Sequence, residues 1–151
     1  STSDPCISSC LSKRHRFRPT KELSKIRNGG MSLNRELNLE KISERLKKFS
    51  KDRNWEQYHS PKNLAMALSV EVAELVEIFQ WSNDGGTKEI KDPETRKQIE
   101  EEIADIFNYL VKFVDLMEID LEKISLEKIQ KNDEKYPVEK SKGKSEKYNK
   151  L

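Results

Sequence analysis

The chain has 151 residues, of which 37% are charged and 34% hydrophobic. This length fits one domain, and no stretch approaches the roughly 18 consecutive apolar residues that a membrane-spanning helix requires, which argues against an integral membrane protein. Five glycines and five prolines exclude collagen-like and proline-rich low-complexity chains.

The charges are unevenly distributed along the chain. Residues 1–30 carry 7 basic and 2 acidic side chains, residues 31–134 carry 16 and 23, and residues 135–151 carry 6 and 2. Because the two ends also contain few hydrophobic residues, burial cannot offset the entropy of ordering them. We therefore predict a disordered segment over 1–30, an acidic helical domain over 31–134 and a basic C-terminal tail over 135–151.

The N-terminal segment, rich in serine and arginine, is compatible with three origins: a leader added by cloning or upstream translation, a native disordered tail, or a targeting segment. Cys6 and Cys10 lie here with only His15 nearby, too few ligands for a structural zinc site, so we interpret them as free thiols. Since the helical domain has no cysteine, we expect a cytoplasmic location. The lysine-rich C-terminal tail is either a solvated segment or a flap over an anionic ligand.

Two helices are predicted in the first half of the domain. A 3-4-3 spacing of apolar residues predicts an amphipathic helix carrying Leu39, Ile42, Leu46 and Phe49. Ser60-Pro61 is a start signal for a second helix that runs to about Trp81 and ends before Gly85-Gly86. This second helix is apolar on two faces, which predicts packing on both sides.

Two further helices follow. Asp92-Pro93 repeats the start signal for a third helix that runs to about Met117, and a fourth begins at Leu121 and ends near Tyr136-Pro137. No segment shows sustained two-residue alternation, so we expect essentially no sheet. The predicted fold is all-α, a four-helix bundle, and its apolar excess predicts self-association into a dimer or higher oligomer.

Two pairs of acids stand out by their position. Glu71-x-x-Glu74 lies on the second predicted helix and Glu102-x-x-Asp105 on the third, and residues three apart share a helix face. Composition alone accounts for the number of such pairs. However, Glu71 and Glu102 each fall within the apolar stripe of their helix, with no lysine or arginine within one turn.

Buried carboxylates without a cation are costly, so they must be protonated, shared or bound to a metal ion. An all-oxygen donor set of Glu71, Glu74, Glu102 and Asp105 suits Mg²⁺, or Mn²⁺, better than zinc. The alternative reading of the same residues is that these acids are ordinary solvated side chains on helix surfaces.

Side chains suited to a nucleotide accompany the acids. Lys128 and Asn132 share a face of the fourth predicted helix and can hold phosphate oxygens. Stacking surfaces for a base are offered by Trp55, Trp81 and Tyr109, although each taken singly is also compatible with ordinary packing. His59 has no serine or cysteine partner in a nucleophile motif, so we interpret it as a binding or structural residue.

Several stretches form a joint pattern: Arg53-Asn-Trp-Glu-Gln-Tyr-His-Ser-Pro-Lys-Asn-Leu-Ala, Glu71-Val-Ala-Glu74, Phe79-Gln-Trp81, Glu101-Glu102-Ile-Ala-Asp105-Ile-Phe-Asn-Tyr109-Leu and Lys128-Ile-Gln-Lys-Asn132-Asp-Glu-Lys-Tyr136-Pro137. Together with the basic run from Lys140 to Tyr148, this pattern resembles the MazG-like nucleotide pyrophosphohydrolases, and within them the dCTP pyrophosphatase branch. The resemblance spans Phe49 to Tyr148, and residues 1–30 have no counterpart in it.

The resemblance implies an all-α nucleoside triphosphate pyrophosphatase assembled as a dimer of dimers with composite sites. It implies that Glu71, Glu74, Glu102 and Asp105 hold Mg²⁺ and are catalytic, that Lys128 and Asn132 contact phosphates, and that Trp55, His59, Trp81 and Tyr109 shape the nucleotide pocket. The expected reaction is hydrolysis of dCTP or a modified dCTP to the monophosphate and pyrophosphate, in nucleotide-pool sanitation. We expect Glu74 to accept the proton of the attacking water.

Two other readings remain open. One is a non-catalytic helical interaction module whose basic ends contact nucleic acid or an acidic partner. Because the domain is acidic, only its ends could bind a polyanion, and we expect no stable nucleic-acid complex. The other keeps the enzyme but changes the substrate to dUTP or a damaged nucleotide.

Overall fold

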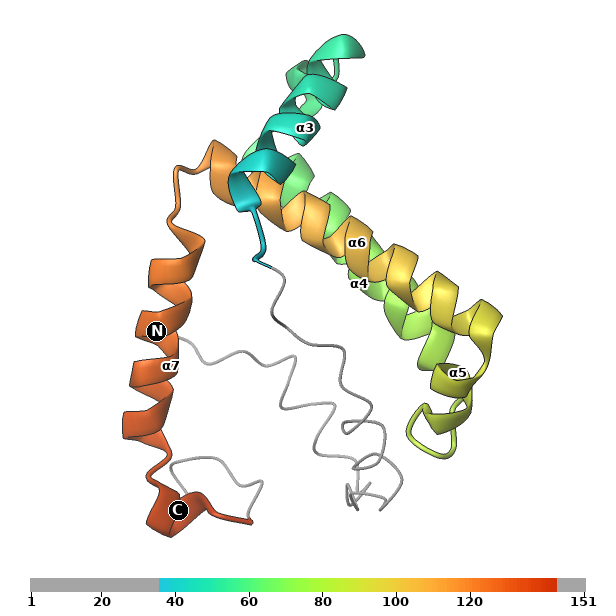
Figure 1. The fold of residues 1–151 in the computed structure, drawn as a ribbon, viewed down its shortest axis with the longest axis vertical. Coiled ribbons are helices and arrows are strands. Elements are labelled where there is room, and N and C mark those ends of the chain that lie inside the picture. Colours follow the sequence, from blue (N-terminus) through green and yellow to red (C-terminus); the bar gives the residue numbers. More distant parts are fainter. Residues whose placement is uncertain (1–35, 144–151) are drawn as a thin grey trace. The chain divides into compact units, whose positions relative to one another are not determined.

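The computed structural model of the chain describes residues 36–143, and all regular structure in this range is helical. In chain order the elements are α3 (Leu39–Asp52), the 3-10 helix η1 (Glu56–Tyr58), α4 (Pro61–Phe79), α5 (Thr87–Lys91), α6 (Pro93–Leu116), α7 (Leu121–Lys135) and α8 (Val138–Ser141) (Figure 1). The prediction of an all-α fold is therefore confirmed. The predictions for residues 1–30, with Cys6 and Cys10, and for residues 144–151 lie outside the described residues.

The long helices begin where the capping signals place them. Ser60 Oγ accepts a hydrogen bond from the Asn63 N–H at 3.2 Å, and Asp92 Oδ2 accepts one from the Thr95 N–H at 2.8 Å. In both helices a proline occupies the first turn, where its missing N–H costs nothing. Asp120 caps α7 through its side chain in the same way. The predicted starts of the second, third and fourth helices are therefore confirmed.

Three short elements were not predicted. The 3-residue η1 lies in the expected loop, the 5-residue α5 follows the glycine pair, and the 4-residue α8 lies within the segment assigned to the C-terminal tail. Elements this short complete little more than one turn, so they carry no repeating apolar pattern that a sequence could reveal.

The core of the described chain lies between α4 and α6. These two helices form the most extensive packing contact and lie side by side in Figure 1. The helices α3 and α5 also pack against α6. Leu64 on α4 and Val111 on α6 are the two hydrophobic side chains that are buried among residues 36–143. The second apolar face of α4 stays open, since Val72 is 43% and Val76 58% exposed.

The helix α7 contributes little to this core. It contains no buried residue, and its Leu126 and Ile129 are 60% and 56% exposed. A 15-residue helix without a packed face is marginal in water, so α7 needs a partner surface. None of the helices within residues 36–143 combines the length and apolarity needed to cross a membrane.

The turn between α4 and α5 depends on a close approach at Gly86. Its backbone φ is +86°, and its N–H donates to Ser82 Oγ at 2.7 Å. A Cβ atom at this position would lie 2.8 Å from Cδ1 of the Phe79 ring, well inside contact distance. Gly85 also has a positive φ, of +74°, but a Cβ there would meet nothing within 4 Å.

We predict that Gly86→Ala lowers the free energy of unfolding by about 1–3 kcal/mol more than Gly85→Ala, because only the former forces a methyl group into the Phe79 ring. Both variants share the strain of a left-handed alanine, so Gly85→Ala is the matched control. Urea denaturation followed by circular dichroism measures the difference. Equal losses in the two variants would contradict this account of the turn.

Candidate active site

Three carboxylates meet where α4 packs against α6. Glu71 and Glu74 of α4 and Glu102 of α6 each place one oxygen within 4.8 Å of the other two. The i, i+3 spacing puts the first two on one face of α4, and the helix packing brings Glu102 opposite them. Glu71 and Glu102 are partly buried and Glu74 is exposed. This arrangement forms a group of acids that could bind a metal ion.

Asp105 lies near this group although it is not one of the three. It follows Glu102 by nearly one turn of α6, and its charge contributes to raising the pKa of both Glu71 and Glu102. The structure therefore brings the two predicted acid pairs together, with three members in mutual contact range and Asp105 beside them.

The carboxylate group carries negative charge that no neighbouring cationic side chain of residues 36–143 neutralises. Desolvation raises the pKa of the Glu71 and Glu102 carboxyls, and repulsion from the neighbouring carboxylates raises both further. Oε2 of Glu102 is buried and has no hydrogen-bond partner. No ion pair joins any of the four acids to a lysine or arginine of residues 36–143. A bound cation would supply the missing charge and the missing partner.

A cavity of about 380 Å³ opens next to the carboxylates, within the size range of small-molecule sites. Asp105 belongs to its wall, together with three of the predicted nucleotide residues, Trp55, His59 and Tyr109. The rest of the wall consists of Arg45, Leu46, Phe49, Asn108 and Lys112. A second cavity, of about 300 Å³, is also lined by Trp55, His59 and Tyr109. Acidic and aromatic parts of the predicted site are therefore adjacent.

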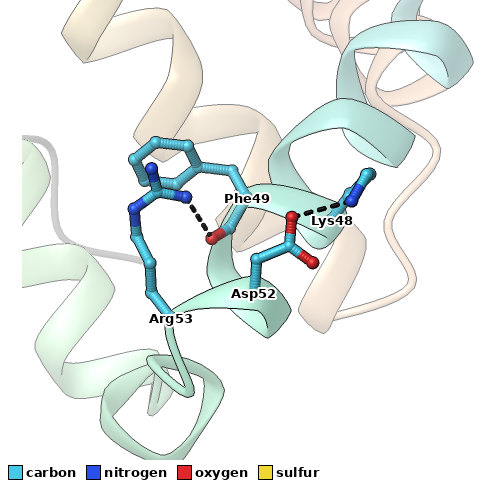
Figure 2. Close-up of polar contacts among 4 residues, drawn as sticks. All are labelled: Lys48, Phe49, Asp52 and Arg53. Carbon is cyan, nitrogen blue, oxygen red and sulfur yellow. Dashed lines mark hydrogen bonds and ion pairs between the residues drawn. The ribbon is translucent and has the colours of Figure 1, made fainter.

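Contacts at the end of α3 hold Trp55 at this cavity. Figure 2 shows Arg53 Nη1 donating to the Phe49 carbonyl oxygen at 3.1 Å, and the Arg53 guanidinium lies 3.7 Å from the centroid of the Phe49 ring. The rings of Phe49 and Trp55 meet edge to face, with centroids 5.7 Å apart and planes at 73°. Asn54 adopts a left-handed φ of +55°, which lets the Trp55 N–H donate to the Ser50 carbonyl oxygen at 2.9 Å.

The same end of α3 carries a surface ion pair, also drawn in Figure 2. Lys48 Nζ lies 2.7 Å from Asp52 Oδ2, one turn apart along the helix. Both side chains are largely exposed, so the pair adds little stability. Because Asp52 pairs with Lys48, the Arg53 guanidinium interacts instead with the ring and the carbonyl oxygen of Phe49.

The surroundings of His59 disfavour the charged form of its imidazole. Partial burial lowers its pKa, and the nearby positive charge of Lys112 lowers it further. A neutral ring can stack on a base and can both donate and accept a hydrogen bond. This supports the interpretation of His59 as a binding residue. Burial also raises the pKa of the Tyr109 hydroxyl, so this group remains an uncharged donor.

Three of the predicted residues lie away from this cavity. Trp81 follows the C-terminal end of α4 and is 84% exposed. Lys128 and Asn132 are exposed on α7. None of the three lines either of the two cavities. Their roles remain predictions.

The cavity also contains residues that the sequence analysis did not select. Asn108 and Lys112 follow Asp105 by three and seven residues on α6, so helical periodicity from the acid pair could have pointed to them. Arg45 enters from α3, and nothing in its local sequence distinguishes it from other surface arginines.

Comparison with known proteins places these residues in a family. A family model described as MazG-like matches residues 66–151. A protein named dCTP pyrophosphatase 1 from Rattus norvegicus is 37% identical over 124 residues, covering 82% of this chain and 73% of that protein. The protein of the same name from Bos taurus is 39% identical over the same shares. The crystal structure of a pyrophosphatase from Archaeoglobus fulgidus superposes with a TM-score of 0.60 at 44% identity, covering 66% of this chain and 92% of that one.

The matched region includes Glu71, Glu74, Glu102 and Asp105 together with the whole of the cavity wall that α6 supplies. The identity to the mammalian relatives extends over most of the chain. The chain belongs to the MazG-like family.

Proposed function

We propose that the chain hydrolyses dCTP or a modified dCTP to the monophosphate and pyrophosphate, using Mg²⁺ held by the carboxylate group. The family and the relatives named dCTP pyrophosphatase 1 support a nucleoside triphosphate pyrophosphatase. The observation that carries the proposal is the group of three carboxylates within 4.8 Å, beside a cavity walled by Trp55, His59 and Tyr109. A nucleoside triphosphate matches this arrangement: its anionic phosphate oxygens suit a cation at the carboxylates, and its flat base suits the aromatic cavity wall.

The donor chemistry fits a hard divalent cation. Glu71, Glu74, Glu102 and Asp105 would hold it, since they offer only carboxylate oxygens and the Glu102 Oε2 atom has no other partner in the described residues. Mn²⁺ accepts the same donors and is the alternative ion. When bound, the cation offsets the charge of the triphosphate and favours ionisation of water.

The residues of the chain then accept the proton of the attacking water and bind the base. Water adds to one phosphorus of the α–β anhydride, and the bond from that phosphorus to the bridging oxygen breaks, which releases pyrophosphate. Glu74 is exposed at the edge of the group, so it can take the proton of the incoming water and return it to solvent. Trp55, Tyr109 and neutral His59 hold the base and exclude water from its faces.

We also infer that the enzyme is a homo-oligomer, a dimer of dimers. Val72 and Val76 on the second face of α4 are exposed, and Ile103 on α6 is 51% exposed. Large apolar side chains exposed on both central helices favour burial against another copy. A second copy would also cover α7 and could bring Lys128, Asn132 and Trp81 to a cavity. A cytoplasmic location remains our proposal, supported by the absence of cysteine outside residues 6 and 10.

Removing a proposed metal ligand should abolish hydrolysis. We predict that Glu71→Gln, Glu102→Gln and Asp105→Asn each reduce pyrophosphate release from dCTP with Mg²⁺ by about 100-fold or more. Glu101→Gln is the matched control, because Glu101 is exposed and pairs with Lys97 at 3.8 Å. A panel of triphosphates, with and without Mg²⁺ and Mn²⁺, identifies the base and the ion. Near wild-type rates in the ligand variants would refute the assignment.

The carboxylate repulsion predicts a pH-dependent stability of the metal-free protein. Because the folded-state pKa values of Glu71 and Glu102 lie above the ordinary value of 4.5, folding favours their protonated forms. Their contribution to stability is therefore fully present below pH 4.5 and is lost as the pH rises through the raised values. Glu102→Gln should raise the melting temperature at pH 7 in EDTA, and this gain should disappear near about pH 4.

Thermal unfolding at both pH values measures this effect. Glu100→Gln is the control of equal charge change, because Glu100 is exposed on α6 and pairs with Arg96 at 3.1 Å. If Glu102→Gln and Glu100→Gln shift the melting temperature equally at pH 7, the carboxyl of Glu102 is not destabilised by its surroundings in the folded state.

Self-association is tested by size-exclusion chromatography with light scattering. We predict a mass above that of the monomer for the wild type and a smaller species for Val76→Asp, because a charge would then lie in the buried contact. Lys62→Asp also introduces an acid on α4, at an exposed position, and should leave the mass unchanged. A monomeric wild type at micromolar concentration would contradict the inference.

A further inference from the structure

Lys112 differs from every other lysine in the described part of the chain. It is the only lysine of residues 36–143 that is partly buried, since all the others are exposed. Burial lowers its pKa, and no carboxylate among those residues forms an ion pair with it. Its Nζ lies 5.4 Å from the centroid of the Tyr109 ring, at the wall of the 380 Å³ cavity. An ammonium held in this way keeps hydrogen-bond donors free for a ligand.

The position of Lys112 along α6 suggests which part of a ligand it meets. Asp105, Tyr109 and Lys112 follow one another at steps of four and three residues, so they share one face of the helix. Lys112 therefore lies about 10 Å beyond the acidic end of the cavity, with the aromatic residues between. If the phosphates lie at Asp105 and the base lies against Tyr109 and Trp55, Lys112 faces the outer edge of the base.

Resting on the proposed function, we propose that Lys112 is a specificity-determining residue whose ammonium donates a hydrogen bond to a carbonyl oxygen on the base. Cytosine presents such a carbonyl at O2, whereas adenine carries no carbonyl. The lysine ammonium is a hydrogen-bond donor only. It can therefore bond to a carbonyl oxygen but not to the N–H donors of an exocyclic amino group. The substrate class that follows is a nucleotide with a carbonyl-bearing base, and adenine nucleotides are disfavoured.

Kinetics with two substrates test this role. For dCTP, Lys112→Met should raise KM by about 10- to 100-fold, as expected for one lost charged hydrogen bond, and should leave kcat nearly unchanged. For dATP, KM should change little. Lys112→Arg should retain part of the preference because it keeps a charged donor. Lys97→Met removes an exposed lysine from the same helix and should change neither substrate.

Equal losses for dCTP and dATP would overturn the proposal, because they would place Lys112 at the phosphates. A fall in kcat with unchanged KM would overturn it as well.

Binding without turnover separates this proposal from the proposed function. Calorimetric titration of the wild type with dCMP and dAMP should show tighter binding of dCMP, and Lys112→Met should remove the difference. If the wild type hydrolyses no triphosphate but Lys112 still controls the dCMP preference, the base-reading role stands and the proposed reaction fails. If dCTP is hydrolysed but dCMP and dAMP bind Lys112→Met as they bind the wild type, only the role of Lys112 fails.

Discussion

The contact between α4 and α6 supports both the fold and the chemistry, and the two make opposite demands on it. Leu64 and Val111 are buried in this region, while Glu71 and Glu102 place partly buried carboxylates where the same two helices face each other. Desolvation and mutual repulsion raise the pKa of both acids, so their ionisation opposes helix packing. The apolar contact is what holds these acidic side chains close together in spite of their mutual repulsion.

Much of this arrangement could be predicted from the sequence, because its signals are local. Ser60 and Asp92 fix the starts of α4 and α6 through short-range caps, and each is followed by proline. Glu71 and Glu102 are conspicuous because acids interrupt apolar stripes. The cavity could not be predicted in the same way. Lys112 acquires its significance only when α3 packs against α6 and closes a wall around it.

In the described residues, the carboxylates and the aromatic wall of the site are assembled, but the helix α7 is not packed against them. The carboxylates and the aromatic wall come together within α3, α4 and α6, whereas α7 has no buried residue. The exposed valines of α4 and the exposed face of α7 are consistent with a protein whose helices pack on two sides. Sequence patterns identify such faces but do not identify what covers them, since the periodicity of a helix carries no information about its partner surface.

The contacts that form the site span very different distances along the sequence. Arg53, Phe49 and Trp55 assemble through contacts over at most six residues, with Asn54 making the turn between them. The carboxylates, by contrast, join Glu71 to Glu102 across thirty-one positions and require the α4–α6 contact. Since short loops close faster than long ones, the contact of Phe49 with Trp55 has a kinetic advantage during folding. A newly made chain would therefore form the Trp55 end of the cavity wall before it brings the acids of α4 and α6 together.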